Sequence, residues 1–225
     1  MKKVTAILLG TLIASSAALA QTNQVLSRNA VGYVKVSIGD NQLDFLTMPF
    51  ESLVPNGNVI SNVVPVASNA TQLITWDEGS QSYIAFTRTK GSWGTAGTNT
   101  LPRGKSFFIR SPAGIAQQFF LMGEVPDRFS APTTTVSIIE GISAVTVAYP
   151  VDTAWTSTAA AALLQNGDQF IIWDGGIQNY IAFTKSKGAW GAATNYVLRP
   201  GQGAFLRKAA TGVTPWNQPK PYTWP

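Results

Sequence analysis

Two segments of the chain repeat the same set of side chains that could contact a ligand. Residues 83–94 read YIAFTRTKGSWG, and residues 180–191 read YIAFTKSKGAWG. Tyrosine and tryptophan rings, where exposed, offer flat apolar faces for sugar rings, and cations attract acidic polysaccharides. A tyrosine, a cation and a tryptophan from each segment are the candidate binding residues: Tyr83, Arg88 and Trp93, and Tyr180, Lys185 and Trp190.

The same residues have a structural interpretation, which we favour. A β-protein without disulfides needs large side chains to fill its core, and core positions are retained when a unit is duplicated. Recurring cations often solvate a strand face or protect a strand edge from unwanted pairing. Trp93 and Trp190 lie beside turn glycines, so we expect these two rings to be the most exposed of the recurring aromatics.

The composition argues against an enzyme. The chain has no histidine and no cysteine, which are common general bases, thiolate nucleophiles and transition-metal ligands. The recurring acids, Asp77 and Asp174, each start a turn, where aspartate accepts backbone N–H groups, and Asp77 with Glu78 would supply only part of a Ca²⁺ shell. The Gly-x-Gly at 201–203 precedes a predicted strand and is a turn, not a phosphate loop. We predict no catalytic residue, cofactor or metal site.

The first 20 residues have the order of a secretory signal peptide. Lys2 and Lys3 precede an apolar run at 6–13, and small residues at 18–20 end the segment. No later stretch reaches the roughly 18 apolar residues of a membrane span. We therefore predict an exported protein without a transmembrane segment, located outside the cell, at the cell surface or in the periplasm.

The charge balance is mildly basic. Removing Lys2 and Lys3 leaves 14 of the 16 basic residues against 11 acidic residues, a net charge of +3 where the whole sequence has +5. The cations are scattered along the chain and not clustered. Nucleic-acid binding usually requires a basic patch, so we predict no nucleic-acid partner.

Hydrophobic alternation predicts strands in both halves of the chain. The first strands are predicted at 31–38 and 43–50 in the first half and at 136–138 and 144–151 in the second. Pro49 and Pro150 would then correspond. From Trp76, which corresponds to Trp173, the halves align at a constant offset of 97 residues.

These patterns predict an all-β fold of two homologous antiparallel units, of sandwich or open-barrel type, in pseudo-twofold tandem. We expect at most short helical turns, including a short helix at 159–164 capped by Ser157 or Thr158. In chain order the segments are a signal peptide (1–20), a lead (21–30), the first unit (31–125), a linker (126–135) and the second unit (136–225). The second unit ends in a Pro- and Trp-rich arm at 214–225, which we expect to be an edge strand or an extended arm.

Several motifs together resemble a family of uncharacterised exported proteins that is common in verrucomicrobial and related bacteria. The motifs are the strand at 43–50, the Trp76-Asp77 hairpin, the turn at Trp93, LPRGKSFFI at 101–109 and MGEV at 122–125. The resemblance covers about residues 29–216 and implies a signal peptide followed by two tandem β-repeats. It implies no catalytic residues. Arg103 and Lys105 depart from the family's usual turn, whereas the second copy stays closer to it at 200–203.

The sequence thus predicts a non-enzymatic exported structural or interaction protein, which could self-assemble at the cell surface or in extracellular matrix. Its partners would be copies of itself or surface glycans. The alternative is a carbohydrate-binding module that uses the exposed aromatics of the repeats.

Overall fold

The computed structural model describes residues 30–127 and 131–223. The predicted signal peptide, and the predicted lead up to residue 29, lie outside the described residues.

The first half of the chain forms a two-stranded ribbon and a four-stranded sheet, both antiparallel. Its elements are β1 (Val31–Ile38), β2 (Leu43–Thr47), α2 (Ile60–Val63), β3 (Gln72–Asp77), β4 (Ser82–Thr87), the 3-10 helix η1 (Gly94–Thr98), β5 (Ser106–Arg110) and β6 (Gln117–Glu124). Strands β1 and β6 make the ribbon, and the sheet has the order β2-β5-β3-β4.

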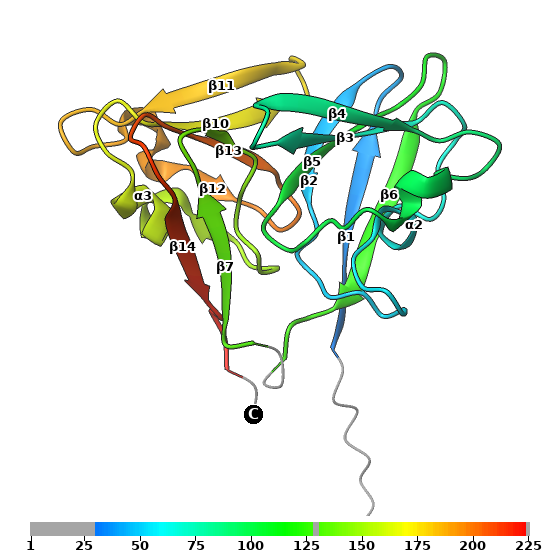
Figure 1. Cartoon of the computed structure of the whole chain (residues 1–225), viewed down its shortest axis with the longest axis horizontal. Helices are drawn as coiled ribbons and strands as arrows, with labels where there is room; N and C mark the ends of the chain where they lie inside the picture. The colour runs from blue at the N-terminus through cyan, green and yellow to red at the C-terminus, as the bar shows by residue number, and fades with distance from the viewer. Residues whose placement is uncertain (1–29, 128–130, 224–225) are drawn as a thin grey trace, which may run out of the picture.

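The second half has the same arrangement. Its elements are β7 (Thr133–Ile138), β8 (Gly141–Ser143), β9 (Thr153–Ala154), η2 (Trp155–Ser157), α3 (Ala159–Leu163), β10 (Gln169–Asp174), β11 (Asn179–Thr184), η3 (Gly191–Asn195), β12 (Val197–Leu198), β13 (Ala204–Lys208) and β14 (Thr214–Pro219). The ribbon is β7-β14, the sheet is β8-β13-β10-β11, and β9 pairs with β12. Figure 1 shows the two halves side by side, with the β3-β4 and β10-β11 hairpins along the top. The predicted all-β class is confirmed.

Each half has its own core, enclosed between the ribbon and one face of the sheet. Corresponding side chains fill the two cores: Val36, Leu73, Ile109 and Phe119 in the first, and Val136, Phe170, Leu206 and Trp216 in the second. Burial of these apolar side chains is the main source of stability.

The other face of each sheet packs against the opposite half. Phe45 and Phe108 of the first half meet Ala144 and Phe205 of the second in a third buried cluster. The Phe45 ring centroid lies 4.2 Å from that of Phe108 and 4.4 Å from that of Phe205. We call this contact between the halves the junction.

Backbone hydrogen bonds cross the junction in matched pairs. The bonds are Thr47 N to Gly201 O (2.9 Å) with Thr146 N to Gly104 O (2.9 Å), and Gly203 N to Phe45 O (2.8 Å) with Ser106 N to Ala144 O (2.9 Å). At Gly203 the chains approach so closely that a Cβ atom would lie 2.9 Å from the Leu46 nitrogen. A larger residue there would force the two halves apart.

Two predictions for the start of the second half are wrong. Strand β8 ends at Ser143, and residues 144–146 bond across the junction where a strand at 144–151 was expected. The matched bonds equate Thr47 with Thr146, so Pro150 corresponds to Glu51 and not to Pro49. The segment at 144–146 is buried between the core of the second half and the junction. This burial, and not a strand, accounts for its apolar sequence.

The predicted helical turns are confirmed. Helix α3 follows Thr158, whose hydroxyl oxygen accepts a hydrogen bond from Ala161 N at 3.2 Å. This N-cap satisfies a backbone donor that the helix leaves unpaired. In the first half the equivalent stretch holds only the single turn of α2.

The C-terminal arm contributes a strand of the second ribbon. Residues 214–219 pair with β7, and the Trp216 side chain is buried. Lys220 N donates to Pro132 O, so these two residues form a hydrogen-bonded pair. Hydrogen-bonded and non-hydrogen-bonded pairs alternate along an antiparallel ladder. Pro215 and Pro219 therefore lie in non-hydrogen-bonded pairs, where the nitrogen faces away from β7. Proline is tolerated at such positions because it has no N–H to donate, which fits the predicted edge strand.

We predict that Trp216→Ala destabilises the protein by about 3–5 kcal/mol, because the indole fills the second core. The free energy of unfolding, from denaturant titration followed by circular dichroism, checks this. The control is Asn217→Ala, on the exposed face of the same strand, which should change stability by no more than about 0.5 kcal/mol. Equal effects of the two substitutions would contradict the role of Trp216 in the core.

Candidate functional site

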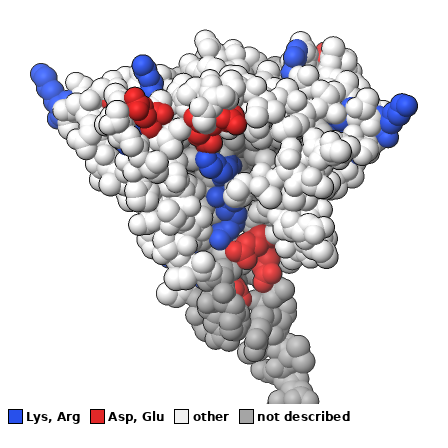
Figure 2. Space-filling view, in the orientation of Figure 1, with Lys and Arg blue, Asp and Glu red and all other residues white. Residues whose placement is uncertain are grey.

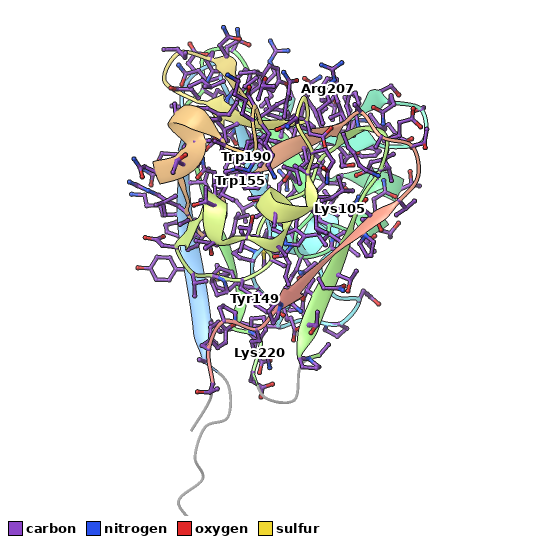
Figure 3. All side chains as sticks on the ribbon, turned by 90° about the vertical axis from the view of Figure 1, so that its left-hand side faces the viewer. Lys105, Tyr149, Trp155, Trp190, Arg207 and Lys220 are labelled. Atoms are coloured by element: carbon purple, nitrogen blue, oxygen red, sulfur yellow. The ribbon has the colours of Figure 1, made fainter. Side chains whose placement is uncertain are left out.

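The two tryptophans expected to be exposed are buried. Trp93 is 6% and Trp190 is 5% exposed, so that prediction is wrong. Trp93 Nε1 donates to Val64 O at 2.9 Å, and Trp190 Nε1 donates to Ala161 O at 3.0 Å. Figure 3 shows Trp190 in the interior beside Trp155, whose ring centroid is 5.0 Å away. The rings turn inward from the glycine turns and close the two cores.

The two recurring cations hold loops together. Arg88 donates to the backbone oxygens of Ala67, Pro65 (3.2 Å) and Gly91 (2.6 Å). Lys185 Nζ donates to Ala161 O at 2.8 Å and to Leu164 O at 2.7 Å, at the end of α3. Each cation thus stabilises the segment that precedes an inner strand of its sheet, β3 for Arg88 and β10 for Lys185. This agrees with the structural interpretation of these residues.

The two recurring tyrosines meet at the junction. The hydroxyl oxygens of Tyr83 and Tyr180 are 2.7 Å apart, and each ring lies edge-on to the tryptophan opposite it in its hairpin, at 4.8 Å from Trp76 and 4.9 Å from Trp173. Burial, and then the hydrogen bond to Tyr83, raise the pKa of Tyr180. The six candidate residues therefore lie in separate places: two tryptophans in the cores, two cations at loops and two tyrosines together at the junction.

The recurring acids stabilise hairpin turns, as the sequence predicts. Asp77 Oδ1 accepts hydrogen bonds from Ser80 N at 2.7 Å and from the Ser80 hydroxyl at 3.1 Å. These bonds lower the pKa of Asp77. Asp174 Oδ1 accepts from Gly176 N at 2.8 Å. Each carboxylate compensates backbone donors that the turn leaves unpaired.

The feature that the sequence did not reveal is a pair of equivalent grooves. The first, which we call the open groove, has a volume of about 780 Å³. Its wall on the second half consists of residues of β10, β11 and the segment 196–202, and its wall on the first half consists of Val34–Ser37 of β1 and residues 44–46 of β2. The second, the closed groove, has a volume of about 400 Å³. Its lining from Thr75 to Lys105 corresponds to that of the open groove at the offset of 97.

Two residue differences between the corresponding segments of the halves accompany the difference in volume. In the closed groove Lys105 forms an ion pair with Glu78, whereas Gln202 and Gly175 occupy these positions in the open groove. A second ion pair nearby joins Arg103 Nη2 to Glu51 Oε1 at 3.1 Å. Figure 2 shows acidic and basic side chains following one another down the middle of this face, between the halves.

A carboxylate without an ion-pair partner among the described residues lines the open groove. Burial raises the pKa of Asp44 to about 6, while a hydrogen bond from Phe45 N (2.9 Å) opposes the shift. The carboxylate faces the hairpin turn of β10 and β11, since a Cβ atom on Gly175 would lie 3.9 Å from Asp44 Oδ1. Nearby, burial raises the pKa of Tyr196, whose hydroxyl accepts a hydrogen bond from Gln202 Nε2.

Comparison with protein-family models, with curated proteins and with solved structures finds no match for this chain. The resemblance to exported tandem β-repeat proteins therefore stays a prediction. Among residues 30–127 and 131–223, no helix has the length and apolar character needed to cross a membrane. The same residues contain no group of three or more acidic side chains placed to hold a metal ion.

We predict that Asp44 weakens the folded state near neutral pH. Its folded pKa of about 6 lies above the ordinary value of 3.8, so the ionised form is the disfavoured one in the folded protein. The contribution of Asp44 to stability is greatest below about pH 4, falls as the pH rises to about 6, and is constant above that. Asp44→Asn should raise the free energy of unfolding at pH 7 by up to about 3 kcal/mol.

Denaturant titrations at several pH values test this, together with the midpoint of the Asp44 carboxyl resonance in an NMR titration. Asp77→Asn is the control with the opposite sign, because its lowered pKa means that the ionised form is favoured in the folded state. It should reduce stability at pH 7. An Asp44 midpoint near 4 would contradict the prediction.

Proposed function

We propose that this protein is a non-enzymatic exported interaction protein that associates with copies of itself through the outer face of the β1-β6 ribbon. The observation that carries the proposal is an apolar patch on that face. The patch consists of Val31 (59% exposed), Tyr33 (70%), Phe120 (46%) and Met122 (55%). Tyr33 and Phe120 are in contact, with ring centroids 6.1 Å apart.

The second ribbon supports the proposal because it provides an internal comparison. It has the same two-stranded pairing and the same inward core residues as the first. Its outer face, however, is mostly polar: Thr133, Thr135, Ser137 and Asn217, with Pro215 and Pro219. Asn217 stands where the first ribbon has Phe120. The fold therefore does not require apolar side chains on this face, and contiguous apolar surface is typical of interaction sites.

The distribution of charge on the patch favours a second copy as the partner. Lys35 lies beside Phe120 on one side of Tyr33, and Glu124 lies beside Val31 on the other side. Two such faces related by a twofold axis would place the cation of each copy near the carboxylate of the other. A twofold interface requires this kind of self-complementarity.

Carbohydrate binding is the second candidate function. It would now rest on Tyr83 and Tyr180, which are adjacent and partly exposed, because Trp93 and Trp190 are buried. A glycan array tests it, and binding that survives Tyr83→Ala and Tyr180→Ala would exclude these rings as the platform.

We predict that the double variant Phe120→Thr, Met122→Thr weakens self-association at least about tenfold in dissociation constant. Loss of apolar side chains at the centre of an interface typically costs more than 1 kcal/mol. The two-stranded face is small beside a standard interface, so association should be weak and visible only at high protein concentration. Light scattering over a wide concentration range measures it.

The matched control is Asn217→Thr, the equivalent exposed position of the second ribbon, which should leave association unchanged. A wild-type protein that stays monomeric at every concentration would refute the proposal. So would a double variant that associates as strongly as the wild type.

A further inference from the structure

The strand β1 has one edge that no other strand of the described chain covers. It pairs only with β6, and Val125 N donates to Ala30 O, which makes residues 30 and 125 a hydrogen-bonded pair. In an antiparallel ladder such pairs alternate. The backbone N–H and C=O groups of Tyr33, Lys35 and Ser37 therefore point away from β6, toward the free edge.

The opposite edge of the same ribbon confirms this alternation. Glu124 is opposite Val31, in a pair that is not hydrogen-bonded within the ribbon. Its backbone N–H and C=O instead bond to Glu51 on the outer side of β6, at 2.8 and 2.9 Å. No hydrogen bond to the backbone of Lys35 or Ser37 from outside the ribbon occurs among the described residues. These groups are available to a partner.

The free edge of β1 forms one wall of the open groove. The groove is lined by Val34–Ser37 on this side and by an apolar wall on the other. The apolar wall comes from β10, β11 and β12: Ile172, Ile181, Phe183 and Val197. A row of unpaired backbone groups that faces apolar side chains suits an extended polypeptide, which forms main-chain hydrogen bonds on one side and places alternate side chains in apolar pockets.

We propose that the open groove binds an extended peptide segment, which adds to the edge of β1 as a third, antiparallel or parallel strand. The segment would alternate apolar with polar residues, the apolar ones lying against Phe183 and Val197. Four residues of β1 span about 13 Å, so the bound core would be about four or five residues long. The proposal does not depend on self-association, since it uses backbone groups at the edge of the ribbon and not the apolar patch, although Lys35 borders both surfaces.

Charge favours a peptide over a polyanion. The groove is lined by two cations, Lys35 and Arg199, and by two carboxylates, Asp44 and Asp174. Their formal charges cancel, so the groove has no net attraction for an acidic polysaccharide. A strand of low net charge matches it.

The closed groove is an internal comparison for the open one. Its described lining includes no residue of β7, the equivalent of β1, and it includes the ion pair between Lys105 and Glu78. The same scaffold thus carries a smaller groove without a strand edge and a larger groove with one.

The test uses labelled nine-residue peptides that alternate valine or leucine with threonine, lysine or glutamate, and shuffled peptides of the same compositions. Fluorescence anisotropy measures binding to the protein without its predicted signal peptide. We expect the alternating peptides to bind more tightly than the shuffled ones. Ser37→Pro removes an N–H at the free edge without removing a bond to β6, and should weaken binding about fivefold to tenfold or more.

Ser137→Pro, at the equivalent edge position of β7, is the matched control and should leave binding unchanged. Val197→Asp, an exposed substitution on the facing wall, is a second variant that should also weaken binding, so the proposal stays testable if Ser37→Pro does not fold. Equal binding of alternating and shuffled peptides, or binding that survives both Ser37→Pro and Val197→Asp, would overturn it. Binding of neutral polysaccharides in place of peptides, lost in Val197→Asp, would overturn it in favour of a glycan site.

Discussion

The junction is the constraint on which the rest of the structure depends. Each four-stranded sheet has two apolar faces, and its own ribbon can cover only one of them. The second face is covered by the other half, through the stacked rings around Phe45 and the matched backbone bonds at Gly201 and Gly104. Side-chain hydrogen bonds also cross the junction: Trp76 Nε1 donates to Ile142 O at 2.9 Å, and Trp173 Nε1 donates to Leu43 O at 3.0 Å. Neither half buries all of its apolar surface alone, and each covers an apolar face of the other.

Local sequence patterns predicted the parts of the fold that are set locally. The hairpins, the cap at Thr158 and the turn role of Asp77 each depend on a few neighbouring residues, and all three are observed. The exposure of Trp93 could not be predicted in this way, because a glycine turn indicates a change of direction but not which side of the chain the core lies on. The strand expected at 144–151 failed for a related reason. The segment is buried continuously because the core of the second half covers one side and the junction covers the other. The junction exists only when the two halves are packed together.

The candidate sites follow from differences between the two halves. Every side chain singled out because it recurs has a structural role that both halves need, such as the loop contacts of Lys185 or the core position of Trp190. The grooves and the ribbon faces differ where corresponding positions of the halves differ, as at Lys105 and Gln202 or at Phe120 and Asn217. The unlike positions were visible in the aligned sequence. Their meaning depended on knowing which of them share a groove, which requires the three-dimensional arrangement.

The crossing of the junction also sets an order of events during folding. A chain that leaves the ribosome or a translocation channel from its N-terminus presents Phe45 and Phe108 long before Phe205 is available to cover them. Contacts between such distant segments form slowly, because a long loop must first close. The second ribbon is completed only when β14, close to the C-terminus, pairs with β7. The newly made chain therefore passes through an interval with an uncovered aromatic surface, in which holding by a chaperone would protect it from aggregation.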